Sequence, residues 1–226
     1  MKPSTVAGTQ SPVPPPDSAR PAPAPGDGRP LILGSTSRYR SELLQRLRIP
    51  FSVAAPDVDE TPRAGEAPAA LATRLALAKA HAVARSSPAA VVIGADQVAD
   101  LAGLPLGKPG NHARARAQLR QMSGQTVVFQ TAVAVVCLES GFAQGSLAAV
   151  RVTFRELSDD EIENYLHAEQ PYDCAGSAKS EGLGIALLAS IESDDPTALI
   201  GLPLIRTCTM LRAAGVSLLA GNRVLS

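Results

Sequence analysis

The sequence predicts an α/β fold built on a mixed, twisted sheet with flanking helices. In the first half of the chain, short apolar runs alternate with segments of helical periodicity, a pattern typical of strand–helix–strand units. In the second half, two long β-branched runs are joined by Glu139-Ser140-Gly141, which indicates a hairpin. The 226 residues are 45% hydrophobic and 19% charged, a composition that supplies a core of ordinary size.

Residues 1–29 differ from the rest of the chain. They hold eight of the 19 prolines, together with Ala, Ser and Gly, and have almost no large apolar side chains. Such a segment cannot bury enough apolar surface to offset the entropy lost on ordering. It also lacks the apolar centre of a secretory signal. We therefore expect a disordered tail at 1–29 and a folded domain at 30–226.

Three strands and three helices are expected before Gly124. The predicted strands are Leu31–Ser35, Phe51–Ala55 and Ala89–Ala95, all short apolar runs. The predicted helices are Arg38–Leu47, Pro68–Arg85, where proline suits the first turn, and a third that Asn111 caps and that ends near Met122. In this prediction Asp96 comes at the end of the third strand.

After Gly124 the pattern becomes richer in β-structure. Strands are expected at Gln125–Leu138, Phe142–Arg155 and Ile185–Ile191. Ser158 and Glu161 have the spacing of a capping box for a helix at Asp159–Ala168. A last helix is expected from Pro203 to Ala214, with Gly215 after its end.

Charge and composition exclude several classes of protein. Lys and Arg together number 21, as do Asp and Glu, so no bulk field attracts nucleic acid or an anionic membrane. Aromatic residues are 3% of the chain and Trp is absent, which disfavours a base-stacking platform. No apolar run approaches the length of a membrane-spanning helix. These observations predict a protein of the cytoplasm without stable nucleic-acid or membrane binding.

The cysteines and histidines show no metal-site or disulfide spacing. The three cysteines are expected to be idle thiols in a reducing compartment. Each of the three histidines lies in a predicted helix, and we expect all three at the surface. These residues are Cys137, Cys174, Cys208, His81, His112 and His167.

Polar and charged residues follow the predicted strands, where ligands of α/β sheets bind. Ser35 and Arg40 follow the first strand, and Glu60 follows the second. Lys79 lies in an Ala- and Leu-rich helix, where a solvated lysine is the simpler reading. Asp96 also has a simpler reading, as a turn residue. Together with Lys108 in a Gly-Lys-Pro turn, these groups could converge on one cleft for a polyphosphate and a divalent metal.

Eight short motifs carry a resemblance to a known family. They are LILGSTSRYR at 31–40, PDVDETP at 56–62, LAKA at 77–80, IGADQV at 93–98, GKP at 107–109, CAGS at 174–177, KSEG at 179–182 and GLPL at 201–204. In this order and spacing the chain resembles the Maf family of small nucleotide pyrophosphatases, named for inhibiting septum formation, from about Leu31 to Gly215. The resemblance implies a Maf/ITPase-like fold with a cleft between two lobes.

The resemblance also implies a reaction and its residues. The reaction is hydrolysis between the α- and β-phosphates of a nucleoside triphosphate, with Mg²⁺ or Mn²⁺ as cofactor. Asp96 would be the proton acceptor, and Glu60 and Asp96 would bind the metal. The residues implied in phosphate binding are Ser35, Arg40, Lys79 and Lys108.

Three positions separate branches of the family, and here they are Tyr39, Gln97 and Glu181. An aromatic residue with Lys-Ser-Glu-Gly resembles the branch that hydrolyses 7-methyl-GTP, which keeps modified nucleotides out of nucleic acid and has a link to division arrest. The chain departs from that branch in having Tyr39 where Trp is more usual and Arg38 where Pro is usual. A dTTP/UTP pyrophosphatase and a non-catalytic, nucleotide-binding regulator of septum formation stay open as alternatives. The resemblance is compatible with a homodimer.

Overall fold

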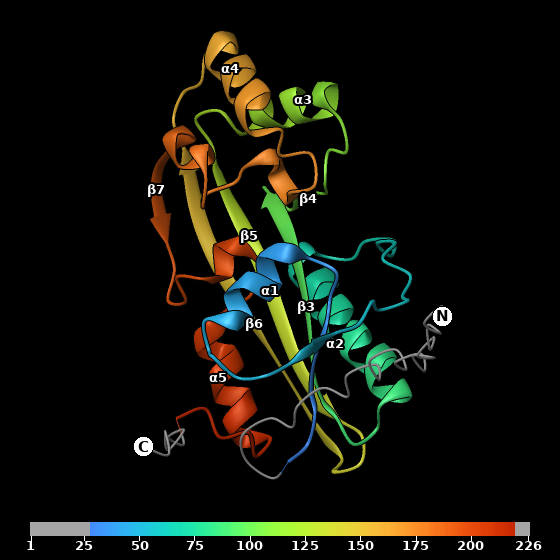
Figure 1. Ribbon diagram of the computed structural model, residues 1–226. Coiled ribbons are helices and arrows are strands. Elements are labelled where there is room, and N and C mark those ends of the chain that lie inside the picture. Colours follow the sequence, from blue (N-terminus) through green and yellow to red (C-terminus); the bar gives the residue numbers. More distant parts are fainter. Residues whose placement is uncertain (1–27, 220–226) are drawn as a thin grey trace, which may run out of the picture.

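A long antiparallel hairpin forms the centre of the computed structural model (Figure 1). Its strands, β5 (Thr126–Cys137) and β6 (Phe142–Phe154), pair without a break from Thr126 opposite Thr153 to Cys137 opposite Phe142. The predicted hairpin is therefore confirmed. The structure describes residues 28–219, so all but the last two residues of the expected tail at 1–29 lie outside the described part.

The strands of residues 28–219 form one mixed sheet of seven strands in the order β2-β1-β3-β5-β6-β7, with β4 paired to β3. β1 is parallel to both β2 and β3, and the other pairs are antiparallel. This confirms the predicted mixed sheet. The remaining strands are β1 (Leu31–Gly34), β2 (Ser52–Val53), β3 (Val91–Leu101), β4 (Leu104–Leu106) and β7 (Leu188–Glu192).

Helices cover both faces of the sheet at one end and one face at the other (Figure 1). Side chains alternate between the faces of a strand, so Ile93 and Val135 pack toward α1 and α5, whereas Val92 and Val136 pack toward α2. At the far end, α3 and α4 pack over Val127 and Phe129. The helices are α1 (Arg38–Gln45), α2 (Pro68–Ser86), α3 (His112–Met122), α4 (Asp159–Glu169) and α5 (Leu204–Ala213), with short 3₁₀ turns η1 (Ala175–Ser177), η2 (Leu183–Leu187) and η3 (Ala198–Ile200). None of the helices in this part of the chain is long and apolar enough to cross a bilayer.

Two predicted helix starts have the expected caps. The Asn111 side chain accepts a hydrogen bond from the backbone N–H of Arg114 at 3.0 Å, which begins α3. Ser158 and Glu161 form both bonds of a capping box at the start of α4. Each cap satisfies backbone N–H groups that have no partner inside the helix.

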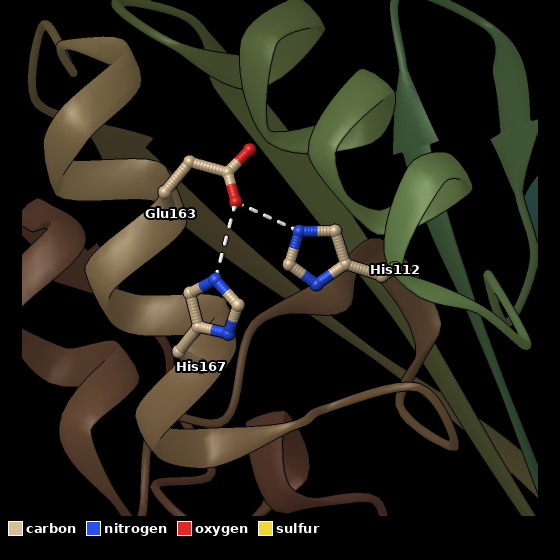
Figure 2. Close-up of side chains that lie close together, drawn as sticks. All are labelled: His112, Glu163 and His167. Carbon is tan, nitrogen blue, oxygen red and sulfur yellow. Dashed lines mark hydrogen bonds and ion pairs between the residues drawn. The ribbon is translucent and has the colours of Figure 1, made fainter.

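The contact between α3 and α4 brings together side chains that are far apart in the sequence. His112, the first residue of α3, lies against Glu163 and His167 of α4 (Figure 2). The expectation of three surface histidines holds fully only for His167, because His81 and His112 are both half-buried. Sequence spacing could not show the group, because its members come from two helices.

Two predicted strands differ clearly from the structure, and one observed strand was not predicted. β3 does not end at Ala95 but continues to Leu101, because β5 continues to pair with it from Val136 to Val128. Asp96 is therefore in the middle of a strand, and the expectation that it ends one is wrong. The predicted strand Ile185–Ile191 begins as a 3₁₀ turn and is extended only from Leu188. β4 was not expected at all.

Candidate active site

The cavity forms where one edge of β3 has no paired strand beside it. β1 stops pairing at Gly34, opposite Gly94, and β4 starts pairing at Ala99. Residues 95–98 therefore have no strand beside them on that edge, although β5 pairs with them on the other. A cavity of about 700 Å³ opens at this gap. The end of β1, rather than the end of β3, thus creates the site.

This cavity is lined by every residue that the sequence predicts to bind phosphate or metal, to accept the proton or to select the substrate. The loops after β1, β2 and β4 contribute to it, as do α2, β3 and the segment after α4. The nine residues are Ser35, Tyr39, Arg40, Glu60, Lys79, Asp96, Gln97, Lys108 and Glu181. Their convergence is a finding, whereas their individual roles stay predictions.

Gly94 allows α2 to lie directly on β3. A Cβ atom at this position would lie 2.3 Å from the carbonyl oxygen of Ala76 and 2.5 Å from the nitrogen of Ala80. The close approach of helix and strand places Lys79 beside Asp96, with 2.6 Å between Nζ and Oδ1. Lys79 is only 5% exposed, so the simpler reading of a solvated lysine is wrong.

The Lys79 ammonium lies between two carboxylates. Besides Asp96 it contacts Oε1 of Glu60 at 2.8 Å. Burial raises the pKa of Asp96, and it outweighs the opposite effects of Lys79 and Arg40. Both carboxylates contact the same cation and offer oxygen atoms, the ligands that Mg²⁺ and Mn²⁺ prefer. Glu60 and Asp96 therefore fit a metal.

Two further cations of the cavity differ in how firmly they are held. Arg40 donates from Nε to the carbonyl of Gly201 at 2.9 Å and from Nη1 to Oγ of Ser35 at 3.2 Å. Loss of water around its guanidinium lowers the pKa of Arg40. Lys108 is exposed and makes no ion pair with any residue of 28–219. Arg40 is thus held by two hydrogen bonds, whereas Lys108 is exposed to solvent.

A second group of charges surrounds Tyr39. Arg38 donates to the Tyr39 hydroxyl at 2.7 Å and places its guanidinium carbon 4.7 Å from the ring centre. The ammonium of Lys179 lies 5.8 Å from the same ring centre. Partial burial raises the pKa of Glu181, while Lys179 lowers it. This part of the cavity can bind a planar group that offers N–H donors.

Gln97 supports the cavity wall. Its amide nitrogen lies 2.9 Å from Oγ1 of Thr131, 3.0 Å from the carbonyl oxygen of Ala198 and 2.9 Å from that of Leu199. Thr131 is fully buried and opposite Gln97 on the neighbouring strand. These bonds attach η3 to the sheet, and Leu199 lines the cavity. Gln97 can therefore influence a ligand through the wall that it holds.

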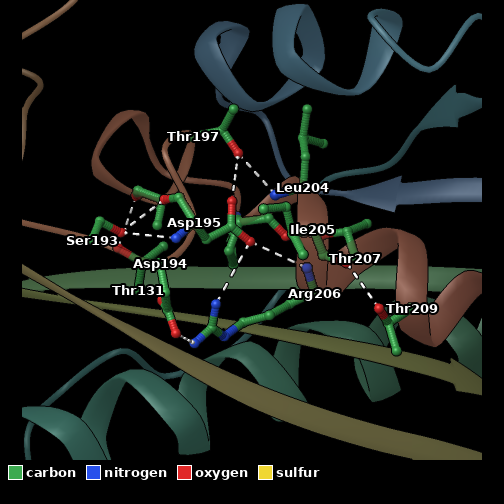
Figure 3. A network of polar contacts seen from close by, with 12 residues as sticks. Thr131, Ser193, Asp194, Asp195, Thr197, Leu204, Ile205, Arg206, Thr207 and Thr209 are labelled. Carbon is green, nitrogen blue, oxygen red and sulfur yellow. Dashed lines mark hydrogen bonds and ion pairs between the residues drawn. The ribbon is translucent and has the colours of Figure 1, made fainter.

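A buried carboxylate, which the sequence reasoning missed, fixes the other side of η3 (Figure 3). Asp195 is fully buried and accepts from the Thr197 hydroxyl at 3.1 Å and from the backbone N–H of Arg206 at 3.1 Å. Arg206 also forms an ion pair with it, with 3.7 Å between Nη1 and Oδ2. The signal in the sequence was the polar run 193–197 directly before an apolar turn, which reads equally well as a solvated loop.

The chain is similar to known proteins of one family. The model of a protein family described as Maf-like protein matches residues 30–214. A relative from a Polaromonas species is 80% identical over 192 residues, covering 85% of this chain and 88% of its own. One from Albidiferax ferrireducens is 72% identical over 191 residues (84% and 96%), and one from Cupriavidus pinatubonensis is 57% identical over 185 residues (82% and 93%). All three relatives are named 7-methyl-GTP pyrophosphatase.

Proposed function

We propose that this chain, which belongs to the Maf family, hydrolyses 7-methyl-GTP to 7-methyl-GMP and diphosphate. The observation that carries the proposal is the buried Lys79–Asp96 pair, with Glu60 on the same ammonium, in a cavity lined by further phosphate-binding groups. The names of the relatives support the choice of substrate.

Asp96 would act as the general base. A water oxygen forms a bond to the α-phosphorus, its proton passes to Asp96, and the bond from the α-phosphorus to the bridging oxygen breaks, releasing diphosphate. The raised pKa of Asp96 brings it closer to the working pH, where a general base is most effective. Lys79, Arg40 and Lys108 neutralise charge on the phosphate oxygens. Mg²⁺ or Mn²⁺ held by Glu60 and Asp96 would supply further charge neutralisation when bound.

Tyr39 and Glu181 would select the base. A carboxylate can accept both N–H groups on one edge of guanine, whereas thymine and uracil offer one. The methylated ring is cationic and gains about 0.5–2 kcal/mol over an aromatic face. Arg38 already lies over the Tyr39 ring, so the base must displace this guanidinium or take the other face.

Two alternatives stay open beside the main proposal. A dTTP/UTP pyrophosphatase would share the Asp96 chemistry, and Glu181 is the residue that disfavours it. A non-catalytic regulator needs no buried base, which disfavours that reading. We further propose the cytoplasm as the compartment, because Cys137, Cys174 and Cys208 are free thiols. A homodimer and the lack of stable nucleic-acid binding stay predictions.

Diphosphate release from a panel of 7-methyl-GTP, GTP, dTTP and UTP, with Mg²⁺ and with Mn²⁺, tests the proposal. Asp96→Asn should lower kcat by about 10²–10⁴-fold, because Asn cannot accept the proton. Asp100→Asn is the matched control, since Asp100 lies on the same strand but outside the cavity lining, and it should keep wild-type kcat. Glu181→Gln should lower kcat/KM for 7-methyl-GTP more than for dTTP. Wild-type preference for dTTP or UTP would contradict the substrate, and an active Asp96→Asn variant would contradict the mechanism.

A further inference from the structure

A second group of metal-ligating side chains lies outside the cavity, where α3 meets α4 (Figure 2). One ligand atom of each of His112, Glu163 and His167 lies within 4.8 Å of the others. Oε2 of Glu163 lies 2.8 Å from Nε2 of His112 and 3.7 Å from Nε2 of His167. None of the three residues lines the cavity of the candidate active site.

These separations suit one small cation. In a tetrahedral site with bonds of about 2.0–2.1 Å, neighbouring ligand atoms are about 3.3–3.4 Å apart. The two observed nitrogen–oxygen distances, 2.8 and 3.7 Å, lie on either side of that value. Glu163 and His167 are one helical turn apart on α4, which fixes their side chains on the same face.

Neighbouring groups orient two of the three ligands. The Tyr172 hydroxyl lies 3.0 Å from Nδ1 of His112, so this ring nitrogen can donate its proton to Tyr172 and leave Nε2 with a free lone pair. Arg116 forms an ion pair through Nε with Oε1 of Glu163 at 2.8 Å, which leaves Oε2 turned toward the histidines. Metal-binding side chains typically have such a polar partner on the side away from the metal.

We propose that His112, Glu163 and His167 form a binding site for a divalent transition-metal ion of the Zn²⁺ class. Two imidazole nitrogens and one carboxylate oxygen favour Zn²⁺, Co²⁺ or Ni²⁺ over Mg²⁺ or Mn²⁺, which prefer oxygen. The positive charge of Arg116 beside Glu163 weakens the attraction between this carboxylate and a divalent ion, so we expect a moderate affinity for the metal.

The site lies next to the cavity of the candidate active site. The backbone N–H of Gly110 donates to the carbonyl of Tyr172 at 3.0 Å. The segment before α3 and the segment after α4 are therefore already in contact. Lys108 and Asp173, on those same two segments, line the cavity. An ion bound between α3 and α4 would therefore lie beside both of these segments.

Imidazole NMR of the wild-type chain tests the proposal without any mutation. The chain has three histidines, and His81 lies on α2, away from the group, as an internal control. One equivalent of Zn²⁺ should shift the ring signals of His112 and His167 and leave those of His81 in place. Mg²⁺ should shift none of the three. Zn²⁺ shifts at His81 alone, or at no histidine, would overturn the proposal.

Variants then separate this site from the candidate active site. In Asp96→Asn the histidine response to Zn²⁺ should be unchanged, which makes the test independent of the proposed hydrolysis. Tyr172→Phe should weaken Zn²⁺ binding by about tenfold, measured by competition with a chromophoric chelator. His112→Asn/His167→Asn should abolish the Zn²⁺-induced rise in Tm, and His81→Asn should keep it. An equal rise in Tm in the double variant and the wild type would refute the site.

Discussion

Replacing Lys79 by Met would leave Asp96 as a buried charge without its closest partner. The side chains of Lys79 and Asp96 are 7% and 10% exposed, so solvent screens the pair little. Removing one partner of a buried ion pair costs about 3–5 kcal/mol. Arg40 remains near Asp96, so we expect the lower value, about 3 kcal/mol, at pH 8. For a domain of this size that equals a fall in Tm of about 6–12 °C.

The effect should depend on pH in a defined direction. Burial holds the pKa of Asp96 above its ordinary range, so the fold favours the protonated carboxyl. The stability linked to Asp96 is therefore present below its unfolded pKa of about 3.9 and is lost as the pH rises through the folded pKa. Without Lys79 the folded pKa rises further. The stability difference between Lys79→Met and the wild type should shrink as the pH falls from 8 to 5.

Urea denaturation at pH 8 and pH 5 measures both effects. Lys79→Met/Asp96→Asn should recover most of the loss at pH 8, because it no longer buries an unpaired charge. Lys108→Met removes an exposed lysine from the same cavity and should change stability by less than about 0.5 kcal/mol. A loss below about 1 kcal/mol for Lys79→Met at pH 8, or a loss that grows toward pH 5, would refute the reasoning.

Three further predictions follow from other contacts in the structure. Gly94→Ala should destabilise the domain by at least about 3 kcal/mol in urea denaturation, because the added methyl group overlaps the backbone of α2; an unchanged midpoint would contradict the close approach. Arg38→Ala should raise kcat/KM for 7-methyl-GTP relative to GTP by about two- to fivefold, equivalent to about 0.5–1 kcal/mol, since it removes a cation beside the cationic base; a fall in this ratio would mean that Arg38 assists binding. A chain beginning at Gly28 should keep its Tm, whereas one beginning at Pro30 should lose about 2–4 °C, because Arg29 hydrogen-bonds the domain; equal Tm values for the two would make those bonds unimportant.

The sequence predicted most elements because local signals agreed with the final packing. The Asn111 cap, the capping box at Ser158 and the hairpin turn at Gly141 all depend on neighbours within a few residues. The true end of β3 was not predictable from the sequence, because polar Asp96 and Gln97 interrupt the apolar run. The strand continues beyond them because β5 pairs with it as far as Asp100. Strand length here is decided by pairing and not by composition.

The candidate site shows the same division between local and long-range causes. All nine residues predicted from the motifs line one cavity. The burial of Lys79, however, depends on the close approach of α2 to Gly94, which lies on another element. In the sequence, Gly94 is one more small residue in a predicted strand, and nothing there indicates that a helix packs on it. Asp195 and the pair of His112 and Glu163 depend on contacts between segments far apart in the chain, which a pattern of spacings does not contain.

The unbroken pairing of β5 and β6 also has a consequence for the way the cavity can change shape. β5 contributes Val133 to the core beneath α1 and α5, Val136 to the core beneath α2 and Phe129 to the core beneath α3 and α4. Within residues 28–219, one continuous ladder thus joins the packing at both ends of the sheet. We therefore expect any opening and closing of the cavity to involve its exposed segments, such as those that carry Glu60 and Lys108, and not bending of the sheet.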